Sequence, residues 1–290
     1  MKNFDYLEPK TVAEACALLK QYGGEAKVFA GGAHLTILMK QGLLEPKSLV
    51  NIKKIADIKG LRYDDAIGLT IGALVTHREL EMSSLVKEKF PVLCEAEREV
   101  ANIRVRNMGT VGGNLASGEP LTDLSQIFIA LDGTVKIAGP NGQRRIAVEE
   151  LFLDFYTTSL AEDEILTQIV LPPLPPRSGI DYIRFSSSSV VDKPAAGVAV
   201  RLTLNFDTTT ETARIVLGCV GATPVRARKA ESFLTGKKIS PELAQEAGSI
   251  AAQECTPTSD LRGSEQYKRA IVKTLVRRAA LKAHERSLQY

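Results

Sequence analysis

Two glycine-rich segments of this sequence combine the residue types that bind phosphate groups. The first is Phe-Ala-Gly-Gly-Ala-His-Leu at residues 29–35, and the second is Gly-Thr-Val-Gly-Gly-Asn-Leu-Ala-Ser-Gly at residues 109–118, followed by Asp123. Adjacent glycines let the backbone approach a ligand closely, and successive amide N–H groups can surround an anion. A helix that starts directly after such a segment adds the positive end of its dipole. Together the two segments predict a clamp around a diphosphate.

Polar side chains in and after the second segment suit the rest of such a ligand. Thr110 and Ser117 offer hydroxyl groups and Asn114 an amide, whereas Asp123 repels phosphate but accepts hydrogen bonds from sugar hydroxyls. The alternative is that each glycine pair only forms a tight turn, because glycine pairs are common in turns. The density of glycine, threonine, asparagine and serine in the second segment favours ligand binding there.

Self-contained catalytic motifs are missing from the sequence. It has no P-loop, no Gly-x-Gly-x-x-Gly fingerprint, and none of the patterns His-Glu-x-x-His, Cys-x-x-Cys or Gly-x-Ser-x-Gly. The histidines, His34, His77 and His284, are too scattered for a histidine metal site, and we interpret His77 and His284 as structural or solvated. Any redox chemistry must therefore come from a bound group.

The composition is that of an ordinary globular protein. A net charge of +3, with acidic and basic residues well mixed, gives no support for a nucleic-acid partner. The N-terminus lacks a secretory signal, and no stretch approaches the roughly 20 apolar residues of a membrane helix. Cys16, Cys94, Cys219 and Cys255 lie far apart, without metal-ligand spacing. We therefore expect a cytoplasmic protein with reduced thiols and no membrane insertion.

A proline-rich segment divides the elements that must position these residues. Four prolines within residues 171–179 exclude helix and central strand and predict an extended linker. Before the linker, capping-box patterns at Thr11 and Thr76 begin helices, Pro140-Asn141-Gly142 marks a hairpin, and further helices are expected at 34–41 and 90–102. The strands expected there span residues 27–29, 48–52, 67–71, 134–138, 144–148 and 165–171.

The order of elements changes after the linker. Strands are expected at 180–185, 197–205 and 213–220, and helices at 227–234, 241–253 and 266–288. Strands followed by helices favour an antiparallel sheet packed with helices. The polar run Ser186–Ser189 predicts a loop.

The order of the two glycine-rich segments and their separation of about 80 residues resemble the FAD-binding medium subunits of the xanthine dehydrogenase and carbon monoxide dehydrogenase family. In that family the first segment usually reads A-G-G-[TH]-[DS]-L, and the second T-[IV]-G-G-N followed by an aspartate. Here 30–32 and 110–114 match, and Asp123 has the family's spacing. Supporting likeness comes from 105–109, from Glu164-Ile165-Leu166-Thr167 and from 221–227.

The resemblance implies an α+β fold. It implies a two-part FAD-binding domain of the PCMH type at residues 1–176, with subdomains of about 1–56 and 57–176, and a C-terminal antiparallel sheet packed with helices at 177–290. FAD is the implied cofactor, and no catalytic residue or metal ligand is expected on this chain. The implied FAD contacts are Val28, Phe29, Ala30, Gly31, Gly32, Ala33, His34, Leu35, Thr110, Val111, Gly112, Gly113, Asn114, Ser117, Asp123, Leu166 and Arg184.

The resemblance also implies partners. Family members work beside an iron–sulfur small subunit and a molybdopterin large subunit, and pass electrons from [2Fe–2S] clusters through FAD to an external acceptor such as NAD or a quinone. Three features depart from the family pattern: Ala33-His34 after the first glycines, Arg184 in place of a lysine, and the run 186–191 in place of a basic stretch. Two alternatives stay open, a stand-alone flavoprotein oxidase and a non-enzymatic module that binds a phosphate-bearing ligand.

Overall fold

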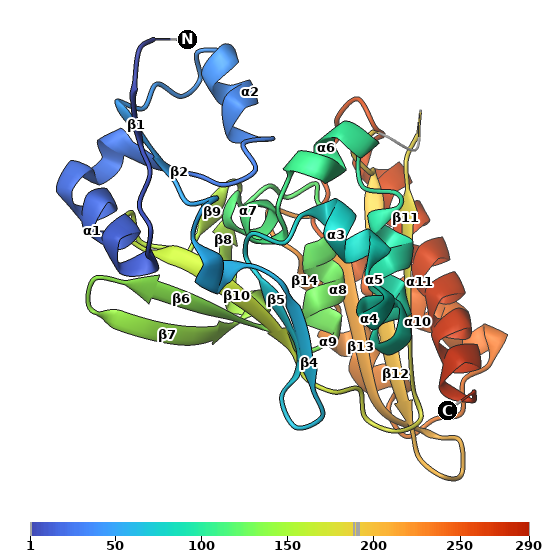
Figure 1. Ribbon diagram of the computed structural model, residues 1–290. Coiled ribbons are helices and arrows are strands. Elements are labelled where there is room, and N and C mark those ends of the chain that lie inside the picture. Colours follow the sequence, from blue (N-terminus) through green and yellow to red (C-terminus); the bar gives the residue numbers. More distant parts are fainter. Residues whose placement is uncertain (1, 188, 190–191, 290) are drawn as a thin grey trace.

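The structure is a computed structural model that describes residues 2–187, 189 and 192–289. Its N-terminal part is a small parallel sheet in the order β1-β3-β2, with α1 packed against it (Figure 1). As predicted, Thr11 caps α1 by accepting a hydrogen bond from the Glu14 amide, and the helix ends at Gly23. The elements are β1 (Asp5–Leu7), α1 (Val12–Tyr22), the 3-10 turn η1 (Gly23–Glu25), β2 (Ala26–Phe29), α2 (Leu35–Lys40) and β3 (Ser48–Asn51).

A five-stranded antiparallel sheet follows, in the order β4-β5-β10-β6-β7. The predicted hairpin is confirmed, because β6 and β7 pair from Thr134 with Ala147 to Gly139 with Gly142. The elements of this part are η2 (Ala56–Ile58), β4 (Leu61–Asp64), β5 (Gly68–Gly72), α3 (His77–Met82), α4 (Ser84–Lys89), α5 (Pro91–Glu97), α6 (Ile103–Met108), α7 (Val111–Ala116), α8 (Leu124–Ala130), β6 (Thr134–Gly139), β7 (Gly142–Ala147), η3 (Val148–Leu151), β8 (Phe152–Asp154), β9 (Thr157–Thr158) and β10 (Ile165–Leu171).

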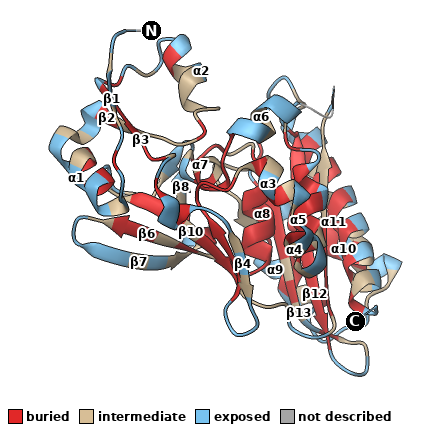
Figure 2. Cartoon of the chain, in the orientation of Figure 1, coloured by how far each residue is buried: buried red, intermediate tan, exposed pale blue. Residues whose placement is uncertain are grey.

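The C-terminal part is an antiparallel sheet in the order β11-β12-β13-β14, followed by helices, as predicted. Alternate residues of a strand face opposite sides of a sheet. In β12, Val198 and Val200 join the core under α10 and α11, whereas Ala199 joins the core that contains α8. Helices therefore cover this sheet on both faces (Figure 2). The elements are β11 (Ser178–Phe185), β12 (Ala196–Leu204), β13 (Thr210–Gly218), β14 (Val225–Arg226), α9 (Arg228–Leu234), α10 (Pro241–Glu254) and α11 (Glu265–Ser287).

Side chains from both sides of the proline-rich segment interlock where α8 meets the C-terminal sheet. Gln126 of α8 is fully buried, and a Cβ at Gly218 of β13 would overlap the Gln126 side-chain amide. Asp132, which follows α8, accepts hydrogen bonds from the guanidinium groups of Arg201 and Arg214 at 2.6 and 2.9 Å. The two halves therefore share one packed interface.

Two expectations about secondary structure were wrong. The helix expected at 90–102 stops earlier: α5 ends at Glu97, Ala101 has a φ of +44°, and Asn102 caps the separate helix α6. The second glycine-rich segment is largely helical, because α7 occupies Val111–Ala116 despite its two glycines. Packing against neighbouring backbone overrides the poor helix propensity of glycine there.

The proline-rich segment is shorter and better packed than a spacer between independent domains. β10 continues to Leu171 and β11 begins at Ser178, so only residues 172–177 lie outside the strands. Leu171 is fully buried, and Leu174 packs against the same core cluster. The prolines end one strand and precede the next without separating the two halves.

Asp181 of β11 makes a pH-dependent contact with the C-terminal helix. It is 7% exposed and lies 3.3 Å from Arg286 of α11, which also pairs with Glu95 of α5. Burial raises the pKa of Asp181 to about 6, although Arg286 opposes the rise. Because this pKa is higher in the folded chain than in the unfolded one, the folded chain binds more protons between about pH 4 and pH 6. Stability from this group is therefore present at low pH and is lost as the pH rises towards 6.

We expect Asp181→Asn to remove that dependence. The free energy of unfolding of the variant, relative to the unmodified chain, should rise by on the order of 2 kcal/mol between pH 4 and pH 7. Urea unfolding at several pH values measures this difference, in which the titration of all other carboxylates cancels. A difference that stays constant across this range would contradict the role of Asp181.

Candidate functional site

The first glycine loop leads the chain from β2 into α2. Gly32 has a φ of +75°, a backbone conformation that favours glycine. Its carbonyl oxygen accepts hydrogen bonds from the amide and the hydroxyl of Thr36 at 3.0 and 2.7 Å. Four consecutive amides have no acceptor among the described residues: those of Gly31, Gly32, Ala33 and His34. The loop therefore offers four N–H donors to an anion.

The second glycine-rich segment lies against the chain that follows β5. The amides of Val111 and Gly112 donate to the carbonyls of Val75 and Ala73 at 2.8 and 3.0 Å. A Cβ at Gly112 would lie 2.7 Å from the Ala73 carbonyl oxygen. Gly112 is therefore required because two backbone segments approach each other closely.

The amides of this second segment are already engaged within the chain. Thr110 is the N-cap of α7, and its hydroxyl accepts the Gly113 amide at 3.1 Å. The expectation that adjacent N–H groups of Gly112 and Gly113 form a second anion nest is therefore wrong. The physical reason is that both donors already have acceptors within the chain: the Gly112 amide donates to the Ala73 carbonyl, and the Gly113 amide donates to the hydroxyl of the helix cap Thr110.

The two glycine-rich segments nevertheless meet. A Cβ at Gly31 would collide with the carbonyl oxygen of Met108 and lie 2.8 Å from the Gly109 Cα atom. In α7, which follows this contact in the chain, the side-chain Oδ1 of Asn114 is buried and has no hydrogen-bond partner among the described residues, and the hydroxyl of Ser117 donates to the Asn114 carbonyl at 2.7 Å. A buried acceptor without a donor is costly unless a ligand supplies one. The site therefore fits a group that carries hydroxyl donors as well as phosphate.

A buried histidine–glutamate pair lies against the second glycine-rich segment. The capping box at Thr76 is confirmed, with Glu79 as its reciprocal partner. His77 donates its backbone N–H to the Gly109 carbonyl at 3.1 Å, and its Nδ1 lies 2.9 Å from a Glu97 carboxylate oxygen. Burial raises the pKa of Glu97, and His77 opposes the rise. This geometry agrees with the structural interpretation of His77.

Asp123 lies in a buried cluster with two side chains from β11. Its Oδ1 accepts a hydrogen bond from the Tyr182 hydroxyl at 2.7 Å and lies 3.5 Å from the Arg184 Nε. Asp123 occupies the N-cap position of α8, but its side chain makes no capping hydrogen bond. Burial raises the pKa of Asp123, and Arg184 opposes this. Tyr182 was not predicted as a site residue. Tyr182 and Arg184 are two residues apart in β11, so their side chains face the same side of the sheet.

Arg184 joins several segments around this cluster. Its guanidinium donates to the backbone carbonyls of Glu99 and Asp192, and to the Ser186 hydroxyl at 3.0 Å. Ser186, Ser187 and Ser189 lie outside helices and strands, as expected, and Ser188 lies outside the described residues. Arg184 of the C-terminal part therefore contacts Glu99, which precedes the second glycine-rich segment, and Asp123, which follows it.

Some of the expected site residues lie in cores. Leu166 of β10 is 4% exposed and belongs to the main core cluster, against which Tyr182 also packs. Val28 and Ala30 pack against the small core of the first sheet. The Phe29 ring lies under the Lys53 ammonium, and Leu35 begins α2.

A second polar cluster was not predicted from the sequence. The Tyr156 hydroxyl donates to Glu119 at 3.2 Å, and the Lys193 ammonium pairs with Glu119 at 2.5 Å. The Tyr156 ring contacts the His34 ring, with centroids 5.9 Å apart. Burial lowers the pKa of His34, which Glu119 opposes. The four residues, at positions 34, 119, 156 and 193, are far apart in the sequence, so no local pattern predicts that they come together.

Metal-ligand clusters and membrane-crossing helices are not found in the part of the chain that the structure describes. No group of three or more His, Cys, Asp or Glu side chains is placed to hold an ion there. Among the same residues, every helix is too short or too polar to cross a bilayer. The four cysteines are buried, unpaired thiols.

Comparison with known proteins places the whole chain among flavin-binding relatives. Residues 2–174 match the FAD binding domain in molybdopterin dehydrogenase, and residues 182–283 match the CO dehydrogenase flavoprotein C-terminal domain. The carbon monoxide dehydrogenase medium chain of Hydrogenophaga pseudoflava is 36% identical over 95% of each chain. The nicotine 6-hydroxylase medium subunit of Paenarthrobacter nicotinovorans is 32% identical over 97% of this chain and 98% of the relative.

Solved structures agree with the sequence matches. A chain of the carbon monoxide dehydrogenase from Hydrogenophaga pseudoflava superposes with a TM-score of 0.94 at 36% identity, over 98% of both chains. The similarity thus spans both halves of the chain and the interface between them.

Proposed function

The chain belongs to the family of FAD-binding medium subunits of molybdenum hydroxylases, and from this premise we propose that it relays electrons between a partner subunit and an external acceptor. It is an oxidoreductase subunit with FAD as its cofactor. Bound FAD supplies the redox group that the chain's own side chains lack. The protein's task is then to hold, orient and shield that group.

We propose that the FAD diphosphate lies at the first glycine loop. The four amides from Gly31 to His34 without a described acceptor carry this placement. Val111, Gly112 and Gly113 would contribute by shape, because their amides are engaged elsewhere. The buried Oδ1 of Asn114 and the carboxylate of Asp123 are acceptors for sugar or ribityl hydroxyls.

The C-terminal half completes this arrangement in the proposal. Arg184 and Tyr182 hold the Asp123 carboxylate, so that one oxygen is fixed and the other remains an acceptor. We place the domain boundary after residue 176, with subdomains of about 1–56 and 57–176 and a C-terminal domain of 177–290. The separate sheets support this division, because the strands of each sheet come from one of the three ranges.

The partners are inferred from the relatives. Several of these are named as medium chains or as subunits of dehydrogenase complexes. We infer an iron–sulfur small subunit that delivers electrons from [2Fe–2S] clusters, a molybdopterin large subunit that oxidises the substrate, and an external acceptor such as NAD or a quinone.

The relay predicts a division of activity between subunits. The isolated chain, loaded with FAD, should transfer electrons from a direct flavin reductant such as NADH to an artificial dye. It should show no turnover with purines, aldehydes, N-heterocycles or carbon monoxide, because the transfer of a water-derived oxygen atom to these substrates needs a metal centre. Adding the two partner subunits should restore turnover with one of these classes.

Two outcomes would reject the relay. Substrate oxidation by the pure single chain would favour a stand-alone flavoprotein oxidase. A purified chain without the visible absorbance of flavin, even after incubation with FAD, would favour a module that binds some other phosphate-bearing ligand.

A further inference from the structure

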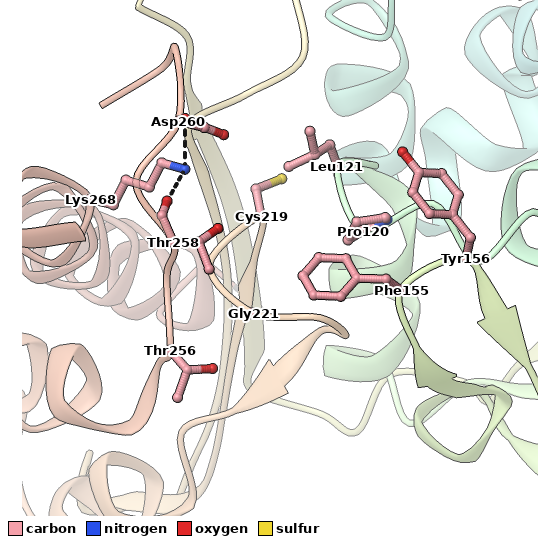
Figure 3. A pocket seen from close by; sticks show the side chains of 10 residues that line it. All are labelled: Pro120, Leu121, Phe155, Tyr156, Cys219, Gly221, Thr256, Thr258, Asp260 and Lys268. Carbon is pink, nitrogen blue, oxygen red and sulfur yellow. Dashed lines mark hydrogen bonds and ion pairs between the residues drawn. The ribbon is translucent and has the colours of Figure 1, made fainter. Parts of the chain in front are cut away.

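A small pocket lies on the five-stranded sheet, where residues of β4, β5 and β10 and of the turn before β4 surround it. It encloses about 100 Å³ between Lys59, Arg62, Thr70 and Gln168. A larger pocket, between the two halves of the chain, adjoins the segment that leads to Asp123 and belongs to the cofactor site proposed above (Figure 3). None of the functions proposed above uses the small pocket.

The strand register places the lining side chains on one face of the sheet. Alternate residues of a strand face opposite sides. Ile71 and Ile169 belong to the main core, so their neighbours Thr70 and Gln168 face away from it. Arg62 lies directly opposite Thr70 in the register and shares this face. The pocket therefore lies on the side of the sheet that the main core does not cover.

Gly72 allows a second stretch of backbone to cross this face. It lies directly opposite Gln168 in the register, and a Cβ on Gly72 would come within 2.6 Å of the Ile58 carbonyl oxygen. The crossing chain is fixed there, because the amides of Gly72 and Leu74 donate to the carbonyls of Gly60 and Ile58 at 2.9 Å each. The pocket therefore has a wall that is in place before any ligand binds.

The pocket presents positive charge without a counterion. Lys59 and Arg62 are exposed, and neither side chain makes an ion pair or a hydrogen bond with another residue that the structure describes. Asp64, two residues after Arg62 in β4, instead accepts the amides of Ala66 and Ile67 at 2.9 and 3.0 Å. The described residues that line the pocket include no Asp or Glu. A cavity lined by charge of one sign attracts ions of the other, here anions.

Polar groups in the pocket also lack partners. Among the described residues, the Thr70 hydroxyl makes no hydrogen bond, the Gly60 amide has no acceptor, and Gln168 Oε1 is buried without a donor. A buried polar group without a partner is costly, so a ligand that pairs with it gains affinity. The ligand must therefore accept hydrogen bonds and also donate one, to Gln168 Oε1.

The rest of this face strengthens the preference for an anion. The register places Lys136 of β6 directly opposite Gln168, and Arg145 of β7 directly opposite Lys136. Like charges in such a pair repel each other. Within the described chain neither forms an ion pair, whereas Arg144, which faces the other side, pairs with Glu164 at 2.7 Å. Lys136 and Arg145 do not line the pocket, but they raise the positive potential around it.

We infer that this pocket binds a phosphate group that carries one proton, as hydrogenphosphate does. Lys59, Arg62, the Thr70 hydroxyl and the Gly60 amide supply positive charge and donors for its anionic oxygens, and Gln168 Oε1 accepts its proton. The volume is far below the roughly 300–1,000 Å³ of pockets for drug-sized ligands, so it holds one such group and not a nucleotide. The site is separate from that of the FAD diphosphate, since its lining residues lie outside both glycine-rich segments.

Equilibrium dialysis of radiolabelled inorganic phosphate tests this site. The chain is loaded with FAD, so that phosphate does not enter the cofactor site, and kept at low ionic strength, because salt weakens exposed ion pairs. We expect saturable binding of one phosphate per chain and weaker competition by sulfate, which has no proton to donate to Gln168. Glycerol phosphate is a second competitor: competition stronger than that of unlabelled phosphate identifies a phosphate ester as the ligand, and weaker competition identifies the free ion.

Arg62→Gln should weaken phosphate binding about tenfold, as expected for the loss of one charge-assisted hydrogen bond, and Lys59→Gln should act in the same direction. Arg145→Gln is the matched control, because it removes the same charge from an exposed arginine on the same face outside the pocket. It should weaken binding by less than about threefold. Flavin absorbance shows that each variant is folded.

Three results would overturn the inference. The first is the absence of saturable phosphate binding by the FAD-loaded chain. The second is equal weakening in Arg62→Gln and Arg145→Gln, because the general charge of the sheet face would then explain the binding. The third is competition by sulfate as strong as that by phosphate, because the proton on the ligand would then have no role.

Discussion

A Gly31→Val chain is expected to lose its FAD. The new Cβ would collide with the backbone carbonyl of Met108 and approach the Gly109 Cα atom at 2.8 Å. Backbone atoms cannot rotate away as the end of a side chain can, so the two glycine-rich segments must separate. The amides of the first loop would then lose their common orientation. Flavin absorbance per chain after gel filtration should fall from near one equivalent to below detection.

The matched control is Gly24→Val. The atoms nearest to a Cβ at Gly24 belong to the Glu162 carboxylate, the closest at 3.1 Å, and this flexible side chain can move. The control should keep its FAD. Overpacking costs about 1–3 kcal/mol, so urea unfolding of both FAD-free variants must show that they remain folded. Full flavin content in a folded Gly31→Val chain would exclude the first loop as the phosphate site.

Asp132→Asn should cause the largest loss of stability among single changes at the interface between the halves. Arg201 is 4% exposed, and its described ionic partner is Asp132. Asparagine tolerates the φ of +53° at this position and keeps the shape of the side chain, but it removes the charge. We expect a loss of about 3 kcal/mol, the lower end for breaking a buried pair, because Asp132 itself is partly exposed.

Arg214→Gln is the control for this prediction. Arg214 contacts the same carboxylate at 2.9 Å but is more exposed than Arg201, so its loss should cost about 1 kcal/mol or less. Burial opposes ionisation of Asp132, but Arg201 and Arg214 outweigh it and hold its pKa below the usual value. The difference between Asp132→Asn and the unmodified chain should therefore shrink as the pH falls below about 4. Equal losses in both variants at neutral pH would contradict the role assigned to buried Arg201.

The sequence predicted the longer elements well, because their periodicity and caps are local. The strands of five or more residues in both larger sheets, the hairpin at Pro140 and helices α9–α11 lie within a few residues of their expected positions, whereas the short strands β4 and β14 were not predicted. The short helices α4, α6, α7 and α8 were missed, since a six-residue helix such as α6 or α7 carries too few turns for a periodic pattern. Their existence depends on caps at Asn102 and Thr110 and on packing against distant backbone.

The candidate site could be predicted only in part, because its contacts join residues that are far apart in the sequence. The glycine pairs identified which segments approach each other, but the pattern could not show which amides remain unused. That depends on Val75 and Ala73, which accept the amides of the second segment from about 40 residues away. Tyr182 and Lys193 reach the site from the C-terminal half, and no local pattern connects them with Asp123 or Glu119.

The interlocked face between α8 and the C-terminal sheet limits how this protein can be recombined with its relatives. The Gln126 side chain occupies the space that a side chain at position 218 would need. The residue types that fit at 126 and at 218 therefore depend on each other, although the proline-rich segment lies between them in the sequence. A chimera joined within residues 172–177 would take one of them from each parent. Such a crossover should yield a folded product only when the parents agree at both positions, whereas a crossover that keeps 126 and 218 from one parent avoids the conflict.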